Sequence, residues 1–201
     1  MLHSMDCYNK SGGNIISQQY TLNFDSPIYL CSDEESQAYI DTSEVQVKRY
    51  NETTVVMTGI FKLLKAFEQG TMIEIIAEKE AGGVYEMVFS HEICNICKEL
   101  TNPESLYKTY MGYFGFPAEC PFEPVSHQYI HWRPQYSVIT NFQNDYNIND
   151  LVTDTEALPL NIATEGRYQV TMNMYKSDED KCLEDKEFLA CLKLDFLVET
   201  V

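Results

Sequence analysis

Basic residues are scarce in this chain: its 201 residues include 14 Lys and Arg against 31 Asp and Glu, for a formal net charge of −17. So negative a surface repels phosphate backbones and anionic membrane surfaces, and nucleic-acid binding is therefore not expected. The sequence also lacks any run of 18 or more apolar residues, so we expect no segment that spans a bilayer.

Several organisational signals are missing as well. There is no internal repeat, no linker and no alternation of strands with helices of the kind that builds parallel sheets. Apolar residues nevertheless make up 44% of the chain, enough for a folded core. We therefore expect one domain over residues 1–201, with its core at about 7–198.

The first ten residues, MLHSMDCYNK, are too polar for the apolar segment of a signal peptide. If the protein is secreted, we expect its leader to have been removed already. Two sequons, at Asn9 and Asn51, would accept N-glycans in that compartment.

Cysteine, by contrast, is abundant. The seven cysteines lie at positions 7, 31, 94, 97, 120, 182 and 191. Their spread along the chain suits long-range disulfides better than one compact metal site, and the odd number leaves one thiol free or paired with another chain.

The stretch HEICNIC, residues 91–97, admits three interpretations. His91, Cys94 and Cys97 could bind zinc together with His127 or His131, but no second CxxC supports this. A redox dithiol is disfavoured because the flanking residues are acidic, which opposes thiolate formation. Structural cysteines are the preferred interpretation, so we expect no metal site.

Alternation of apolar and polar residues dominates the chain and predicts strands. The expected strands cover 19–24, 44–50, 53–67, 126–139, 167–175 and 188–198, with a hairpin over 71–89 that turns at 81–83. Helical spacing predicts a short helix within 91–102 and a second short piece within 104–116, whereas the polar stretch 141–154 is expected to be an exposed excursion. The fold class predicted is an all-β, antiparallel two-sheet sandwich or cup of about eight strands with one short helical insertion.

An ordered set of features spans the chain. It comprises Cys7, the hairpin AEKEAGGVYEMVF, Cys94 at a short helix, Cys120-Pro121-Phe122, the strand beginning Gly166-Arg167-Tyr168, and the last strand around Cys191. This set resembles the ganglioside-activator branch of the ML (lipid-recognition) superfamily, and within it the insect chemosensory CheB-like proteins. The resemblance implies a secreted β-cup that holds a lipid, without catalysis or a cofactor. It also implies disulfides Cys7–Cys191 and Cys94–Cys120, and it leaves Cys31, Cys97 and Cys182 without assigned partners.

Candidate ligand-binding residues are large apolar side chains on alternating strand faces and aromatic residues of the segment 106–116, which is expected at the rim of the cup. They are Met57, Phe61, Leu63, Tyr110, Tyr113, Phe114, Phe116, Tyr168, Val170, Met172, Met174, Leu194 and Phe196. For any single one of them, ordinary core packing is the better explanation. The sequence does not decide whether the cup is open or filled.

Three functions remain open. The chain is expected to be a secreted carrier or presenter of lipid or pheromone-like hydrocarbons in chemosensation. Alternatives are a lysosomal activator that presents glycolipid to a hydrolase, or a disulfide-braced interaction module without ligand. A receptor or a hydrolase would be the protein partner. An enzyme is not expected, because no nucleophile, base and orienting group form a recognisable pattern.

Overall fold

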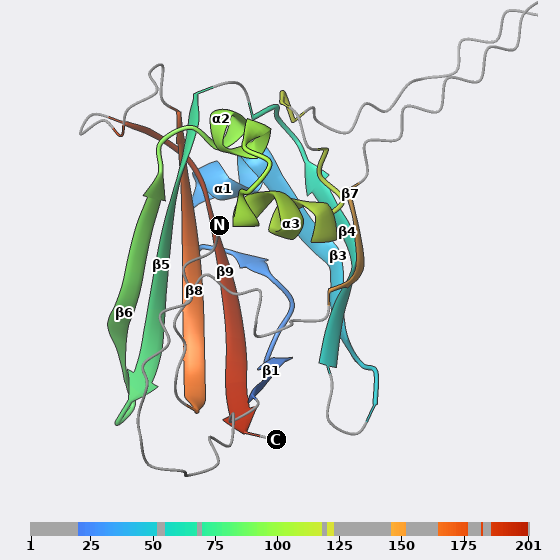
Figure 1. The fold of residues 1–201 in the computed structure, drawn as a ribbon, viewed down its shortest axis with the longest axis vertical. Coiled ribbons are helices and arrows are strands. Elements are labelled where there is room, and N and C mark those ends of the chain that lie inside the picture. The colour runs from blue at the N-terminus through green and yellow to red at the C-terminus, as the bar shows by residue number, and fades with distance from the viewer. Residues whose placement is uncertain are drawn as a thin grey trace, which may run out of the picture.

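The computed structural model describes residues 20–51, 55–67, 70–117, 120–122, 146–151, 165–176, 182 and 186–200, and their arrangement is drawn in Figure 1. The strands are β1 (Tyr20–Phe24), β2 (Tyr29–Leu30), β3 (Ile40–Arg49), β4 (Val55–Leu63), β5 (Thr71–Ala81), β6 (Val84–Ile93), β7 (Tyr146–Leu151), β8 (Gly166–Lys176) and β9 (Glu187–Thr200). The helices are α1 (Glu34–Tyr39), α2 (Ile96–Thr101) and α3 (Leu106–Tyr113).

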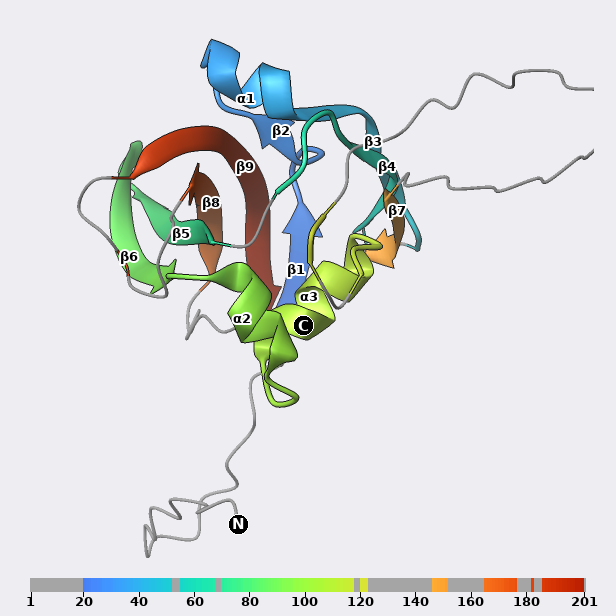
Figure 2. The same ribbon diagram turned by 90° about the horizontal axis from the view of Figure 1, so that it is seen from above.

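The strands form two antiparallel sheets. In the larger one the order is β1-β9-β8-β5-β6, and β2 adds to β9; in the smaller one it is β3-β4-β7. Seen from above, the larger sheet curls around one side, the smaller sheet stands opposite, and α2 and α3 lie across the gap between them (Figure 2). This confirms the predicted all-β, two-sheet antiparallel class.

The core lies between the inner faces of the two sheets. Adjacent strands of the larger sheet place apolar side chains opposite each other, with Tyr168 paired to Phe196 and Val170 to Leu194. From the smaller sheet, Met57 and Phe61 enter the same cluster of buried residues. Because side chains of a strand alternate between faces, the period-two patterns of β4, β8 and β9 produced this core.

Most predicted strands are present, but two local predictions need correction. Tyr146 and Ile148 are buried in β7, which pairs with β4, so the stretch 141–154 is not simply an exposed excursion. Sequence reasoning missed this strand because its two inward side chains are flanked by Asn and Asp residues. The predicted helix over 91–102 begins only at Ile96, because His91 to Ile93 still pair with β5.

Helix α1 was not predicted, since its six residues lack an apolar period. Its N-cap is Asp33, whose carboxylate accepts a 2.7 Å hydrogen bond from the Ser36 amide. The predicted strand 126–139 lies outside the described residues.

Two neighbouring leucines at the end of β4 provide a test of the core. Leu63 is 0% exposed and Leu64 is 48% exposed. Leu63→Ala should lower the free energy of unfolding by about 2 to 5 kcal/mol, because it removes buried methyl groups and leaves a cavity. Leu64→Ala should change it by less than about 0.5 kcal/mol. Denaturant unfolding measures both, and equal losses would contradict this packing.

Candidate ligand-binding site

Three disulfides tie the described segments together: Cys31–Cys191, Cys94–Cys182 and Cys97–Cys120. Both pairings implied by the family resemblance, Cys7–Cys191 and Cys94–Cys120, are therefore wrong. The three cysteines left unassigned, Cys31, Cys97 and Cys182, are each a partner in one of these bonds. Cys7 lies outside the described residues.

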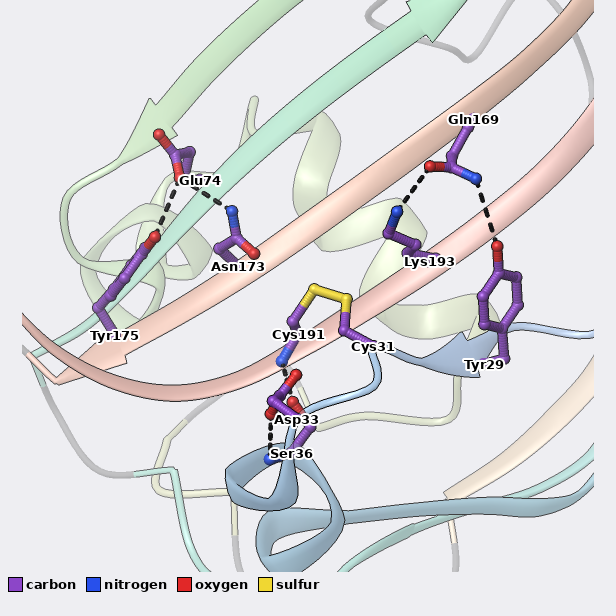
Figure 3. The surroundings of a disulfide bond; sticks show 10 residues. All are labelled: Tyr29, Cys31, Asp33, Ser36, Glu74, Gln169, Asn173, Tyr175, Cys191 and Lys193. Atoms are coloured by element: carbon purple, nitrogen blue, oxygen red, sulfur yellow. Dashed lines mark hydrogen bonds between the residues drawn. A yellow bond between two sulfur atoms is a disulfide. The ribbon is translucent and has the colours of Figure 1, made fainter. Parts of the chain in front are cut away.

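The partner of Cys191 follows from strand pairing. Leu30 in β2 pairs with Leu192 in β9, so the next residue, Cys31, lies beside Cys191 with their Cα atoms 5.3 Å apart. The Cys31 amide also donates a 3.0 Å hydrogen bond to the Cys191 carbonyl. Figure 3 shows the Cys31–Cys191 disulfide with Ser36 of α1 nearby. A two-residue strand carries no readable alternation, which is why sequence reasoning missed it.

The two cysteines of HEICNIC have different partners. Cys94 follows β6 and bonds to Cys182, whereas Cys97 in the first turn of α2 bonds to Cys120. Neither sulfur is then available as a thiolate, so neither zinc binding nor a Cys94–Cys97 redox pair fits this arrangement. Within the described ranges, no group of three or more His, Cys, Asp or Glu could hold a metal ion.

The outer face of the larger sheet carries a group of hydrogen-bonded polar side chains. The Glu74 carboxylate accepts hydrogen bonds from Asn173 at 3.0 Å and Tyr175 at 3.1 Å, and Figure 3 shows these side chains together. The Tyr29 hydroxyl donates to Asp195 at 2.8 Å. Burial and the neighbouring Asp195 carboxylate raise the pKa of Tyr29 to about 12, so it stays a neutral donor at physiological pH. These polar groups are hydrogen-bonded to one another.

An apolar cavity of about 90 Å³ lies between the sheets, next to α2 and α3. All its lining residues except Thr71 are apolar, and three of them are methionines. They are Ile28, Phe61, Leu63, Phe67, Thr71, Ile73, Ile96, Met111, Phe114, Phe116, Phe122, Met172, Met174 and Leu192. Such a wall can enclose hydrocarbon but offers no charged group for acid–base chemistry.

The structure brings six of the predicted ligand-binding residues to this cavity: Phe61, Leu63, Phe114, Phe116, Met172 and Met174. Five others belong to the core without lining it, namely Met57, Tyr168, Val170, Leu194 and Phe196. The side chains of Tyr110 and Tyr113 lie outside what the structure describes. Ile96 and Met111 were missed because α2 and α3 are too short to show which side faces the core.

The aromatic residues after α3, Phe114 and Phe116, are half-buried and pack against other aromatic rings. The Phe116 ring stacks on Tyr146 with centroids 4.3 Å apart, and it also meets Phe61 at 5.5 Å and Phe122 at 5.1 Å. Gly115 allows this approach: its φ is 72°, and an added Cβ would lie 2.7 Å from the Asn147 carbonyl oxygen. These contacts hold the segment after α3 against β7, where Phe116 also lines the cavity.

No protein-family sequence model matches this chain, and no characterised protein is similar enough to it in sequence to count as a relative. The resemblance to the ML superfamily therefore stays an expectation drawn from the order of its features. Among the described residues, no helix is long and apolar enough to cross a membrane.

Peptide mapping of the unreduced protein tests the disulfides. It should recover Cys31 linked to Cys191, Cys94 to Cys182, and Cys97 to Cys120. Replacing both Cys97 and Cys120 by Ser should lower the free energy of unfolding by about 3.4 kcal/mol, the chain-entropy value for a loop of this length. Recovery of a Cys94–Cys120 peptide would contradict the arrangement of α2.

Proposed function

We propose that this chain is a secreted, non-enzymatic carrier that holds a slender hydrophobic molecule between its two sheets. The observation that supports this most directly is the apolar cavity, walled by both sheets and by α2 and α3. The three disulfides support an oxidising compartment such as the extracellular space.

The size of the cavity restricts the ligand. At about 90 Å³ it is smaller than the roughly 150 Å³ in which an apolar cavity holds a benzene-sized molecule. It therefore accommodates the end of an unbranched chain rather than a ring system. Met111, Met172 and Met174 lie on its wall, and methionine side chains rearrange at little cost because they are unbranched and flexible. A longer chain enters as these three side chains move apart.

The expected affinity follows from the number of methylenes enclosed. The cavity of about 90 Å³ encloses only the end of a chain. Once the three methionine side chains have moved apart to enclose about ten to twelve methylenes, these contribute roughly 8 to 10 kcal/mol, at about 0.8 kcal/mol each. Association and ordering consume several kcal/mol, so we expect micromolar dissociation constants at best. The charge of −17 disfavours anionic head groups, which makes neutral long-chain alcohols, esters or hydrocarbons the preferred class.

The biological role that we propose is the one implied by the CheB-like resemblance: presentation of lipid or pheromone-like hydrocarbons in chemosensation. A measurement of expression by tissue separates this role from its alternative. Expression confined to sensory tissue would support it, whereas expression in all tissues would favour the activator that presents glycolipid to a hydrolase.

A second candidate function rests on the filled interior. A cluster of 23 buried residues occupies most of the space between the sheets, as in proteins that bind nothing there. In that case the chain is a disulfide-braced interaction module, and the cavity is a packing defect.

Two measurements separate the candidates: native mass spectrometry of the secreted protein, and then titration with hexadecanol as a neutral long-chain probe. Met172→Trp should abolish binding, because the larger ring fills the cavity that Met172 lines. Met87→Trp, the same substitution at a side chain that is 65% exposed, should leave binding unchanged.

Both variants are first checked for intact disulfides and an unchanged melting temperature, so that loss of binding is not loss of folding. If no lipid copurifies and hexadecanol does not bind below about 100 μM, the carrier proposal is wrong and the interaction module replaces it.

A further inference from the structure

Exposed apolar side chains gather on one strand, β6. Val84, Tyr85, Met87 and Val88 are exposed by 64%, 41%, 65% and 54%, and they lie within the five positions 84–88. We call these four residues the β6 patch. Over the described residues, the only other large apolar side chains so exposed are Tyr50 and Leu64, which lie singly. Scattered apolar residues are normal on a surface, but a contiguous group marks a contact site.

The patch lies on an edge of the larger sheet. In the part of the chain that the structure describes, β6 pairs with β5 alone, and Figure 1 shows it at the outer side of that sheet. Alternate residues of such a strand turn their N–H and C=O groups away from the sheet. An exposed edge of this kind is a template for an additional strand unless charge or proline blocks it.

A bulge limits how much of the edge can pair. Phe89 lies opposite Ala77 and Met87 opposite Glu78, so Val88 is an extra residue on β6. The side chains before and after Val88 are therefore out of phase. The segment Val84–Met87 remains as a regular edge.

A second copy of this chain does not fit the edge. In a symmetric dimer with its two-fold axis at Val88, the β6 residues before the bulge would pair with the β6 residues after the bulge in the other copy. The extra residue at Val88 puts these two segments out of register. A ladder confined to Val84–Met87 would place the two Glu86 carboxylates directly or diagonally opposite each other. Like charges in such positions are destabilising, and each copy also carries a net charge of −17.

A lipid bilayer does not fit either. Hydrocarbon offers no partner for the outward N–H and C=O groups of an open sheet edge, so such edges do not enter it. The carboxylates nearby, on Glu78 and Glu80 of β5 and Glu86 of β6, also oppose anionic head groups.

The side chains indicate what does fit. Tyr85 and Met87 share one face, opposite Glu80 and Glu78, whereas Glu86 lies on the other face, opposite Lys79. Lys79 itself is directed at the Tyr168 ring, with its Nζ 5.5 Å from the ring centroid. A strand added to β6 would therefore meet Tyr85 and Met87 on one face, and the Glu86 carboxylate beside Val84 on the other. Alternating apolar and basic residues complement that pattern.

We propose that the Val84–Met87 edge of β6 binds another protein by strand addition, and that the segment it takes is extended, with basic and apolar residues in alternation. This site is on the outer edge of the larger sheet and is independent of what the cavity holds.

The test uses a disulfide-closed hairpin peptide whose free strand reads Lys-Val-Lys-Val-Lys, and a second hairpin with Glu in place of Lys. The Lys hairpin should bind the folded protein, and its affinity should fall at least about tenfold between low and high salt, since exposed charges are screened. A Lys hairpin with N-methylated amides along its free edge should not bind, because it cannot join the ladder.

Charge reversal gives the sharpest comparison. Glu86→Lys should lose the Lys hairpin and gain the Glu hairpin. Glu104→Lys, which makes the same charge change at an exposed residue between α2 and α3, should behave as the unmodified protein does. Both variants should keep the original melting temperature.

Three results would overturn the proposal. One is failure of the Lys hairpin to bind below about 1 mM. Another is equal binding of the two hairpins, or binding that survives N-methylation. The third is evidence that the β6 patch binds something else. Such evidence would be a dimer in sedimentation, or adsorption to phosphatidylcholine vesicles, that is lost in Met87→Lys but kept in Leu64→Lys.

Discussion

Strand β9 is the element on which the remainder of the described structure depends. Its 14 residues pair with β8 along one edge and with β1 and β2 along the other. It also carries Cys191, which is bonded to Cys31, and its inner face supplies Leu192, Phe196 and Val198 to the core. The positions of β1, β2 and β8 therefore require the correct register of this strand, since a slip by one residue would turn its inward apolar side chains outward.

Part of β9 is covered on both faces. Ala190, Cys191 and Leu192 are all buried, although consecutive side chains of a strand point to opposite sides. Helix α1 accounts for this, because the Cys191 amide donates a buried 2.7 Å hydrogen bond to the Ser36 hydroxyl. The helix and the disulfide thus cover the outer face of β9 at Cys191.

The inside and the outside of this protein have different chemistry. The cavity presents hydrocarbon and sulfur, whereas the outer face of the larger sheet presents paired carboxylates, amides and hydroxyls. The strong negative charge is kept away from the cavity, so it does not oppose an uncharged ligand inside. An apolar guest and a basic protein partner could then occupy separate surfaces of the same molecule.

Periodicity in the sequence was sufficient for most of the strands and for part of the cavity wall. Alternation in β4, β8 and β9 depends only on which side of a strand faces water, so Phe61, Met172 and Met174 could be identified without knowing their neighbours. The disulfides could not be identified in this way, because pairing depends on distance in space, and the two-residue strand that brings Cys31 to Cys191 has no pattern of its own. The same limit applies to β7 and α1, whose inward side chains stand among polar residues. Local side-chain chemistry thus determined the fold class and the apolar faces, whereas the tertiary structure alone decided how far the core fills the cup, because packing between segments distant in sequence sets that volume.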